Sequence, residues 1–324
     1  MTDTGPLFVS SGDLIADRRY RWALEEAAHG DLAAAADILT QTVERQPGFA
    51  AAWFTLGTVR DRLGDRAGAI EAFAKARAAD PEDYHGAQLQ LARLDSGNAT
   101  PAMSEAYVRS LFDQYAARYD AALTEQLAYR GPAILLAAVE AAMQAEGTRL
   151  HFGSVVDLGC GTGLGGAAFR PFVDWLIGVD LSPAMIAQAT AKGLYDRLVT
   201  ADIATFLADA AANGARYHLI FAADVFVYIN DVRQAFAAVA RVLTPGGLFA
   251  FTVETHGGDG VKLLPTLRYA HGEPAVRRAL AAAGLFVVSI AAAAVRSEKG
   301  VPVDGLVVVA RASTAQPTPA TSAG

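Results

Sequence analysis

The residues of this chain best suited to hold a nucleotide-like ligand lie where an apolar run meets a glycine-rich turn. Asp157 stands near the end of the apolar run, which predicts a buried strand, and Gly159, Gly161 and Gly163 follow at alternate positions. Apolar residues 164–169 then predict a helix. A strand, a glycine turn and a helix bring backbone N–H groups close to a ligand at the edge of an α/β sheet. Glycine is required wherever a side chain would block that approach.

The glycine spacing alone fits two kinds of cofactor. Gly161, Gly163 and Gly166 also satisfy G-x-G-x-x-G, and Asp180 follows Gly161 at the distance expected of a dinucleotide-binding acid. Asp157 favours a different ligand, because a carboxylate beside the turn repels a pyrophosphate and attracts an ammonium or a sulfonium group. S-adenosylmethionine carries both of these cations and no phosphate.

Residues 157–163, D-L-G-C-G-T-G, closely resemble the first motif of the class I S-adenosylmethionine-dependent methyltransferases. The D-L-S-P-x-M sequence at 180–185 and the L-x-P-G-G turn at 243–247 are two further hallmarks of that family. The resemblance covers about residues 105–312. It implies transfer of a methyl group from S-adenosylmethionine to a small-molecule, carrier-bound or protein acceptor, and no metal site.

The resemblance also implies which residues contact the cofactor. Asp180 ends the second predicted strand and would accept hydrogen bonds from both ribose hydroxyls. Asp202 and Ile203 would contact the adenine amino group and ring, although Asp202 also fits a helix N-cap. Met185 would pack on the adenine edge or lie in the core. The complete set of predicted contacts is Asp157, Gly159, Gly161, Gly163, Asp180, Leu181, Met185, Asp202, Ile203, Ala223, Tyr115 and Tyr119.

An F-x-x-Y-A-x-x-Y-D pattern at 112–120 resembles the helix that precedes the glycine motif in the methyltransferases of quinone and biotin synthesis. It implies a helix over residues 105–127 that covers the cofactor, with Tyr115 or Tyr119 facing it. The same spacing fits an aromatic stripe in the core.

Catalysis by in-line displacement mainly requires alignment of the acceptor with the methyl group and exclusion of water. An acceptor hydroxyl of low acidity would also need a base. His256 and His271 are the candidates, with Tyr228 as a hydrogen-bonding partner, and Arg268 is a candidate clamp for an acceptor carboxylate. Each of these residue types also occurs in ordinary surface or capping roles. The proline-proline-aromatic element with which the family methylates planar amide or adenine nitrogens is missing after the fourth predicted strand.

The fold class expected for the second half is α/β. Strands are expected at residues 151–158, 175–179, 198–201, 217–222, 248–253, 285–290 and 305–310, with helices between them. This alternation predicts a doubly wound, Rossmann-like sheet of seven strands with an antiparallel last strand. The expected domains are a disordered N-terminus at 1–14, helical repeats at 15–98, a linker at 99–104, a catalytic domain at 105–312 with lid helices at 105–150, and a disordered tail at 313–324.

The first half contains an internal repeat of 34 residues. Gly30 recurs as Gly64 and Pro47 recurs as Pro81. The second copy matches nearly every signature position of a tetratricopeptide repeat, from Trp53 onward. The resemblance implies an all-α stack that binds a partner protein, packs on its own catalytic domain or mediates self-association.

Composition narrows the function classes. The net charge of −7 argues against a general affinity for nucleic acid or anionic membranes. The single cysteine, Cys160, fits a reducing compartment, and neither a signal peptide nor a membrane span is predicted, so a cytoplasmic location is expected. Residues 279–295 are apolar, but Gly284 divides them into a predicted helix end and a strand.

Two alternative functions remain at this point. The first is an NAD(P)-dependent oxidoreductase, which Asp157, Asp202 and the 245–247 turn disfavour. The second is a non-catalytic adaptor that uses the repeats and keeps a vestigial cofactor fold. The intact acids and glycines of the 157–180 segment argue against such decay.

Overall fold

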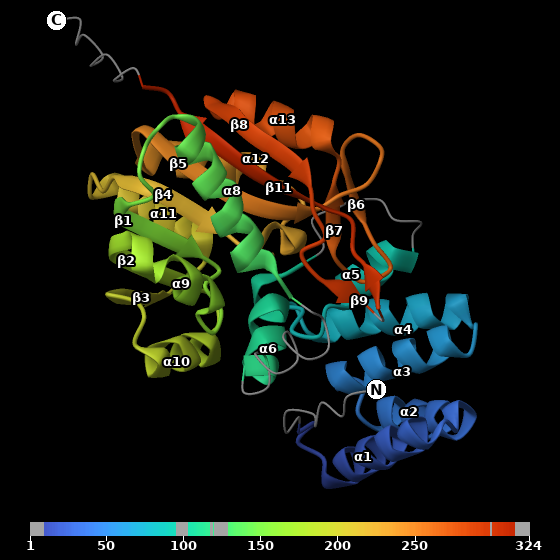
Figure 1. Ribbon diagram of the computed structural model, residues 1–324. Coiled ribbons are helices and arrows are strands. Elements are labelled where there is room, and N and C mark those ends of the chain that lie inside the picture. The colour runs from blue at the N-terminus through green and yellow to red at the C-terminus, as the bar shows by residue number, and fades with distance from the viewer. Residues whose placement is uncertain (1–9, 95–102, 117–118, 120–128, 299, 315–324) are drawn as a thin grey trace, which may run out of the picture. The chain divides into compact units, whose positions relative to one another are not determined.

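The computed structural model describes residues 10–94, 103–116, 119, 129–298 and 300–314 (Figure 1). It divides into two compact units, residues 1–114 with 263–267 and residues 115–262 with 268–324. The boundary between the two units falls after residue 114, whereas the catalytic domain was expected to begin at residue 105. The helix that begins there belongs to the first unit almost to its end. The predicted 99–104 linker falls mostly outside the described residues.

The first unit consists of helices, as the repeat predicts. They are α1 (Leu14–His29), α2 (Leu32–Arg45), α3 (Ala50–Arg62), α4 (Arg66–Ala79), α5 (Ala87–Leu94) and α6 (Glu105–Tyr115). Ser104 caps α6 as predicted, because its hydroxyl accepts a hydrogen bond of 3.0 Å from the Tyr107 N–H.

The two repeat copies have the same local geometry. Gly30 and Gly64 adopt φ of 92° and 83°, and Asp31 and Asp65 each accept a hydrogen bond of 2.9 Å from the backbone N–H three residues later. The glycine ends one helix and the aspartate caps the next, so the 34-residue period is a repeated turn.

Close packing explains the small residues of the second repeat. A Cβ atom on Gly57 would lie 2.7 Å from the Phe73 ring, which has no exposed surface. Glycine at this position therefore lets α3 approach α4.

The ends of the first unit differ from the prediction in two places. Residues 10–14 were expected to be disordered, but the Asp13 carboxylate accepts hydrogen bonds from the Ile15 and Ala16 N–H groups and caps α1. The second place is the last repeat helix, which begins only at Ala87 although helical repeats were expected throughout 15–98; Asp83 accepts a hydrogen bond of 2.7 Å from the Ala87 N–H.

The second unit contains the sheet. Its main path has the strand order β3-β2-β1-β4-β5-β11-β8, which confirms the seven-strand prediction, while β6 and β7 pair beside β5. The strands are β1 (Phe152–Leu158), β2 (Val173–Asp180), β3 (Arg197–Thr200), β4 (Tyr217–Ala222), β5 (Leu243–Glu254), β6 (Val261–Leu263), β7 (Tyr269–His271), β8 (Leu285–Ala292) and β11 (Gly305–Ala312). A short hairpin of β9 (Ser297–Glu298) and β10 (Val301–Pro302) stands apart from this sheet.

Helices cover both faces of the sheet. On one face, α8 (Gly131–Ala145) and α9 (Leu164–Phe169) share a core with Val155 and Val307. On the other face, α11 (Ile203–Ala212), α12 (Arg233–Val242) and α13 (Glu273–Ala282) share a core with Val156 and Val308 (Figure 1). Consecutive strand residues point to opposite faces, so Asp157 points to the same face as Val155. A further helix, α10 (Pro183–Lys192), connects β2 to β3.

The last strand is antiparallel to both of its neighbours, β5 and β8, as predicted. The predicted turn at 244–247 was wrong in one respect, because these residues form the irregular start of β5 and Gly246 has φ of 75°. The apolar 279–295 segment forms the end of α13 and all of β8. Among the helices of the described ranges, none combines the length and the apolar character that a membrane crossing requires.

Candidate functional site

The three glycines of the turn after β1 differ in what lies beside them. Gly159, Gly161 and Gly163 all have positive φ, between 52° and 97°. A Cβ atom on Gly159 would collide with Val225 at 2.5 Å, and one on Gly163 would meet Tyr195 at 3.2 Å. A Cβ atom on Gly161 would meet one described atom within 4 Å, Tyr119 Cε1 at 3.8 Å. Among the described residues, Val225 and Tyr195 therefore fill the space beside Gly159 and Gly163, whereas an added Cβ atom on Gly161 would meet Tyr119 alone, at contact distance.

Asp180 lies across this turn from β2. Its Oδ2 atom accepts a hydrogen bond of 2.8 Å from the Gly161 N–H, and its Oδ1 atom accepts one of 2.8 Å from the Ser182 N–H. A carboxylate has about four lone-pair directions, and these two bonds fix its orientation. The structure thus brings the predicted ribose acid to Gly161.

Asp157 points below the turn. It is 2% exposed, and its Oδ2 atom accepts a hydrogen bond of 2.7 Å from the Tyr195 hydroxyl. Burial raises the pKa of Asp157 to about 8, although the Tyr195 hydrogen bond acts in the opposite direction. Asp180 adds to the rise because its negative charge is close. The predicted contact with a ligand ammonium group therefore requires loss of a proton from Asp157.

The residues predicted to contact the adenine side of the cofactor differ in their exposure and in their hydrogen-bond partners. Met185 has no exposed surface, so the structure places it in the core and does not support its predicted packing on adenine. Asp202 caps α11, with Oδ1 accepting a hydrogen bond of 3.0 Å from the Thr205 N–H. Leu181, Ile203 and Ala223 are each partly exposed after strands β2, β3 and β4.

The lid prediction rests on two tyrosines. Tyr119 lies over Gly161, as the 3.8 Å distance shows, and desolvation, Tyr228 and Asp224 raise its pKa. Tyr115 ends α6 and is partly exposed. The rest of the predicted lid helix, residues 117–118 and 120–127, lies outside the described residues.

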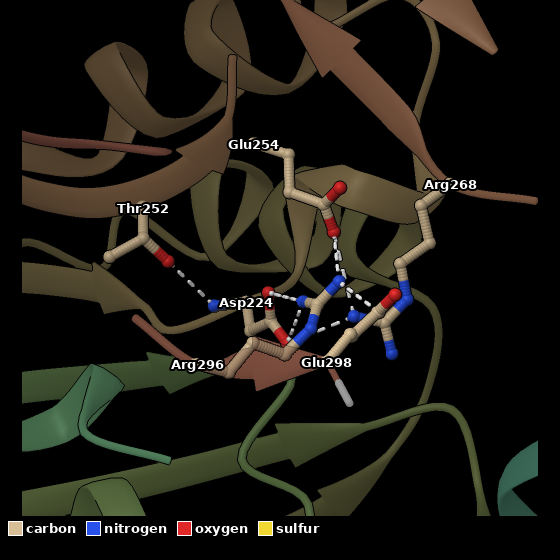
Figure 2. Close-up of polar contacts among 6 residues, drawn as sticks. All are labelled: Asp224, Thr252, Glu254, Arg268, Arg296 and Glu298. Atoms are coloured by element: carbon tan, nitrogen blue, oxygen red, sulfur yellow. Dashed lines mark hydrogen bonds and ion pairs between the residues drawn. The ribbon is translucent and has the colours of Figure 1, made fainter. Parts of the chain in front are cut away.

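Charged side chains gather where β4 and β5 end (Figure 2). Arg296 Nη1 bonds both carboxylate oxygens of Asp224, at 2.9 and 3.0 Å. Arg296 Nη2 donates to Glu254 Oε1 and, at 3.1 Å, to Glu298. The side chains of Arg296 and Glu254 are 0% and 1% exposed. We call Asp224, Glu254, Arg268, Arg296 and Glu298 the ion cluster.

Arg268 is the more loosely held arginine of the ion cluster. Its Nη1 atom lies 3.5 Å from Glu254 Oε1 and 3.6 Å from Asp224 Oδ2, beyond hydrogen-bonding distance. Its guanidinium lies over the Tyr228 ring, 5.6 Å from the centroid, as in a cation–π contact. The structure thus pairs two predicted residues with each other and with two acids, so Arg268 is not the isolated carboxylate clamp that the sequence predicted.

Asp224 has an uncommon backbone conformation. Its φ is 60°, a region that few residues other than glycine adopt. Its N–H donates a hydrogen bond of 2.8 Å to Thr252 Oγ1 on β5. This bond and the two to Arg296 hold the strained residue in place.

The two predicted histidine bases lie apart from the turn and have other partners. His271 is 2% exposed and donates a hydrogen bond of 3.0 Å from Nε2 to the Phe226 carbonyl. Burial lowers its pKa. His271 therefore braces the segment after β4, and its role as a base stays a prediction.

His256 accepts a hydrogen bond of 3.1 Å at Nδ1 from the Gly258 N–H. It lines a hollow of about 890 Å³ formed by the loop after β5, the start of α13, the end of β8 and the start of β11. None of the predicted cofactor residues lines that hollow.

Sequence reasoning missed four residues of this region: Asp224, Glu254, Arg296 and Tyr195. Asp224 and Glu254 carried a usable signal, because each follows a predicted parallel strand at the ligand-binding edge. Tyr195 and Arg296 are brought in from loops 38 and 72 residues away from their partners. No local pattern marks such residues.

The sheet order, the glycine turn and the acid at the end of β2 define a nucleotide-binding α/β domain of the methyltransferase type. A family model described as a methyltransferase domain matches residues 156–251, and a tetratricopeptide repeat model matches residues 26–94. The chain therefore contains a methyltransferase domain and also carries tetratricopeptide repeats, as the motifs predicted.

Similar proteins include malonyl-[acyl-carrier protein] O-methyltransferase of Pseudescherichia vulneris. It is 35% identical over 118 residues, which cover 36% of this chain and 43% of that protein. Methyltransferase-like protein 27 of Homo sapiens is 37% identical over 108 residues, 33% of this chain and 42% of that protein. The chain thus spans less than half the length of these relatives.

The solved structure of Burkholderia thailandensis 1,6-didemethyltoxoflavin-N1-methyltransferase, with bound 1,6-didemethyltoxoflavin and S-adenosylhomocysteine, has a similar fold. The TM-score is 0.50 at 20% sequence identity, and the similarity covers 64% of this chain and 88% of that one. At this identity the likeness concerns the fold alone.

Proposed function

We propose that the second unit transfers a methyl group from S-adenosylmethionine to a small-molecule, carrier-bound or protein acceptor. The observation that carries the proposal is the Gly161 backbone beside the carboxylate of Asp180, where Tyr119 is the one described residue within 4 Å of an added Cβ atom. The turn offers a place for close approach of a ligand, and Asp180 supplies oriented acceptors for ribose hydroxyls. The methyltransferase family match over this segment supports the same function.

Three residues at or beside the turn have defined tasks in this proposal. S-adenosylmethionine, when bound, supplies a methyl group on a sulfonium, from which a neutral thioether leaves readily. Asp180 holds the nucleoside, and ionised Asp157 accepts from the ammonium group. Tyr119 covers Gly161 and excludes water from the reacting groups. These residues bind and orient, and the acceptor must be supplied beyond Tyr119 and the end of β4.

The names of the relatives widen the choice of acceptors. One of the two relatives is named for its action on malonyl-[acyl-carrier protein], and the name of the other states no target. A carrier-bound acceptor is therefore one proposal for this chain, alongside a small molecule or a protein. We further propose that the tetratricopeptide unit binds a protein partner or mediates self-association, and that the chain works in the cytoplasm, as its single cysteine favours.

Calorimetric titration of the full chain tests the cofactor directly. We expect S-adenosylmethionine and S-adenosylhomocysteine to bind and NADH not to bind. Binding of NADH in place of S-adenosylhomocysteine would establish the oxidoreductase alternative. Incubation with an isotopically labelled methyl donor and cell extract then tests the activity, and cofactor binding without any labelled product would favour the adaptor alternative.

A further inference from the structure

The ion cluster borders the glycine turn. Strand β4 pairs with β1 in register, with Asp157 opposite Phe221, so the residues after β4 lie beside the turn after β1. Val225 packs on Gly159, where a Cβ atom would come within 2.5 Å. Asp224 and Asp180 both contribute to the raised pKa of Tyr119, after desolvation and Tyr228. One tyrosine thus lies within electrostatic reach of both the cofactor acid and the ion cluster.

The charges of the ion cluster do not balance. Three carboxylates, those of Asp224, Glu254 and Glu298, face two guanidiniums, those of Arg268 and Arg296. The ionised cluster therefore carries one excess negative charge. Arg296 donates to all three acids, and Arg268 lies between two of them. Arg268 Nη1 has no hydrogen-bond partner among the described residues, but both arginines already face acids of the cluster, so a second excess negative charge would meet repulsion.

Glu254 has one oxygen without a partner. Its Oε1 atom accepts from Arg296, whereas Oε2 is buried and has no hydrogen-bond partner among the described residues. Figure 2 shows this second oxygen directed away from both guanidiniums. A buried carboxylate oxygen without a donor is costly, and native structures normally give such an atom a partner. An N–H donor from a ligand would supply that partner.

We propose that the ion cluster is the acceptor side of the site and that the group methylated is an uncharged amine. This inference rests on the proposed methyltransferase function and names its substrate class. An amine offers a lone pair to the methyl carbon and an N–H to Glu254 Oε2. The loosely held Arg268 is the side chain that moves aside to admit it. The excess negative charge of the ion cluster disfavours a carboxylate or another anion.

The reaction keeps the charge beside the ion cluster. The nitrogen lone pair forms the N–C bond while the C–S bond breaks, and sulfur keeps the bonding pair as a neutral thioether. The positive charge moves from sulfur to nitrogen, where the negative cluster continues to stabilise it. The new ammonium then releases one proton to Glu254 Oε2 and from there to solvent. Burial raises the pKa of Glu254, which makes its carboxylate a better proton acceptor.

Sinefungin tests this inference without knowledge of the acceptor. It is an analogue of S-adenosylhomocysteine in which a carbon bearing an amino group replaces the sulfur, so it places an ammonium group where the methyl group and the acceptor nitrogen meet. We expect calorimetry to show sinefungin binding about tenfold more tightly than S-adenosylhomocysteine, as a charge-assisted hydrogen bond provides. The preference should fall to about threefold or less in Glu254→Gln and in Asp224→Asn.

The controls separate this inference from the proposed function. Glu140→Gln removes an exposed carboxylate of α8 and should keep the full preference. The affinity for S-adenosylhomocysteine, measured on every variant, reports whether the cofactor site is intact. If Glu254→Gln does not fold, Asp224→Asn alone tests whether the ion cluster provides the preference for sinefungin. Equal affinity for the two analogues, or a preference that survives in both cluster variants, overturns the amine acceptor alone. Failure of wild type to bind S-adenosylmethionine or either analogue overturns the methyltransferase function as well.

Discussion

Tyr195 and Asp157 form a buried pair beneath the glycine turn. The Tyr195 hydroxyl donates a hydrogen bond of 2.7 Å to Asp157 and accepts one of 3.0 Å from the Gly166 N–H. Its ring also occupies the space that Cβ atoms on Gly163, Gly166 and Gly178 would need, at 3.2, 2.5 and 2.9 Å. Part of the glycine pattern that marks a nucleotide-binding turn is therefore dictated by this tyrosine.

Tyr195→Phe should shift the pH dependence of S-adenosylmethionine binding. The ligand ammonium binds the ionised form of Asp157, so affinity should rise as pH approaches the pKa of Asp157, which is about 8, and should fall again where the ammonium group itself loses its proton. The Tyr195 hydrogen bond lowers that pKa, and its loss should move the midpoint to higher pH. Calorimetry between pH 6 and 10 measures the midpoint. Phenylalanine keeps the ring that the three glycines accommodate, so the fold should survive.

A matched control for this change is Tyr217→Phe, at a tyrosine that is 6% exposed and packs on Phe206 away from the turn. It should leave the midpoint unchanged. An unchanged midpoint in Tyr195→Phe would show that Asp157 does not bind the ligand in its ionised form.

Asp157→Asn should weaken cofactor binding and increase the free energy of unfolding at neutral pH. The folded chain holds a proton on Asp157 up to about pH 8, whereas the unfolded chain releases it near the ordinary pKa of 3.8. The free energy of unfolding therefore falls as pH rises from about 4 to 8, by at most about 1.4 kcal/mol per pH unit, and is constant above that range. Asparagine removes this slope. Urea unfolding at pH 5 and pH 8 should show a smaller difference for the variant, and an identical difference would contradict the raised pKa.

The sequence predicted the sheet well because its signals are local. Each parallel strand is a short apolar run that ends at a turn-forming or acidic residue, and the acids at strand ends collect at one edge. Asp180 could therefore be placed from its position in the chain. The same reasoning could not decide between two roles for Met185, because a buried residue at helical spacing looks the same whether it contacts a ligand or the core.

Contacts between distant loops could not be predicted. Arg296 follows β8 and reaches Asp224 across 72 residues, and nothing near either residue in the sequence specifies the pair. His271 looked like a loop histidine, yet β7 places it against the Phe226 carbonyl. The domain boundary moved for a similar reason, since the Ser104 hydroxyl bonds the Asp83 carbonyl and ties the start of α6 to the first unit.

Asp180→Ala should weaken S-adenosylhomocysteine binding by roughly 1–3 kcal/mol, the cost of losing charge-assisted hydrogen bonds. The effect is direct through the ribose hydroxyls and indirect through Gly161, whose N–H loses its acceptor. The control is Asp174→Ala, at an exposed aspartate of β2 that pairs with His151, and this variant should bind normally. Equal calorimetric affinities for Asp180→Ala and wild type would remove Asp180 from the site.

Gly161→Ala should abolish cofactor binding while the chain remains folded. The added methyl group would occupy the space over the turn, and a φ of 52° costs alanine about 1 kcal/mol. Gly193→Ala is a close control, because Gly193 has φ of 62° and an added Cβ atom has no neighbour within 4 Å among the described residues. Thermal unfolding should show similar losses of stability for both variants. Retained binding in Gly161→Ala would mean that the ligand does not approach this backbone.

Arg296→Met should destabilise the second unit far more than Arg268→Met. Removal of Arg296 leaves the buried carboxylates of Asp224 and Glu254 without their main partner, and breaking a buried ion pair in this way costs about 3–5 kcal/mol. Arg268 is 21% exposed and lies at least 3.5 Å from either acid, so its loss should cost about 1 kcal/mol, as for a partly solvated pair. Chemical denaturation followed by near-ultraviolet circular dichroism measures both. Equal losses would show that the two arginines share the charge of Asp224 and Glu254, and that Arg268 is too firmly held to move aside for an acceptor.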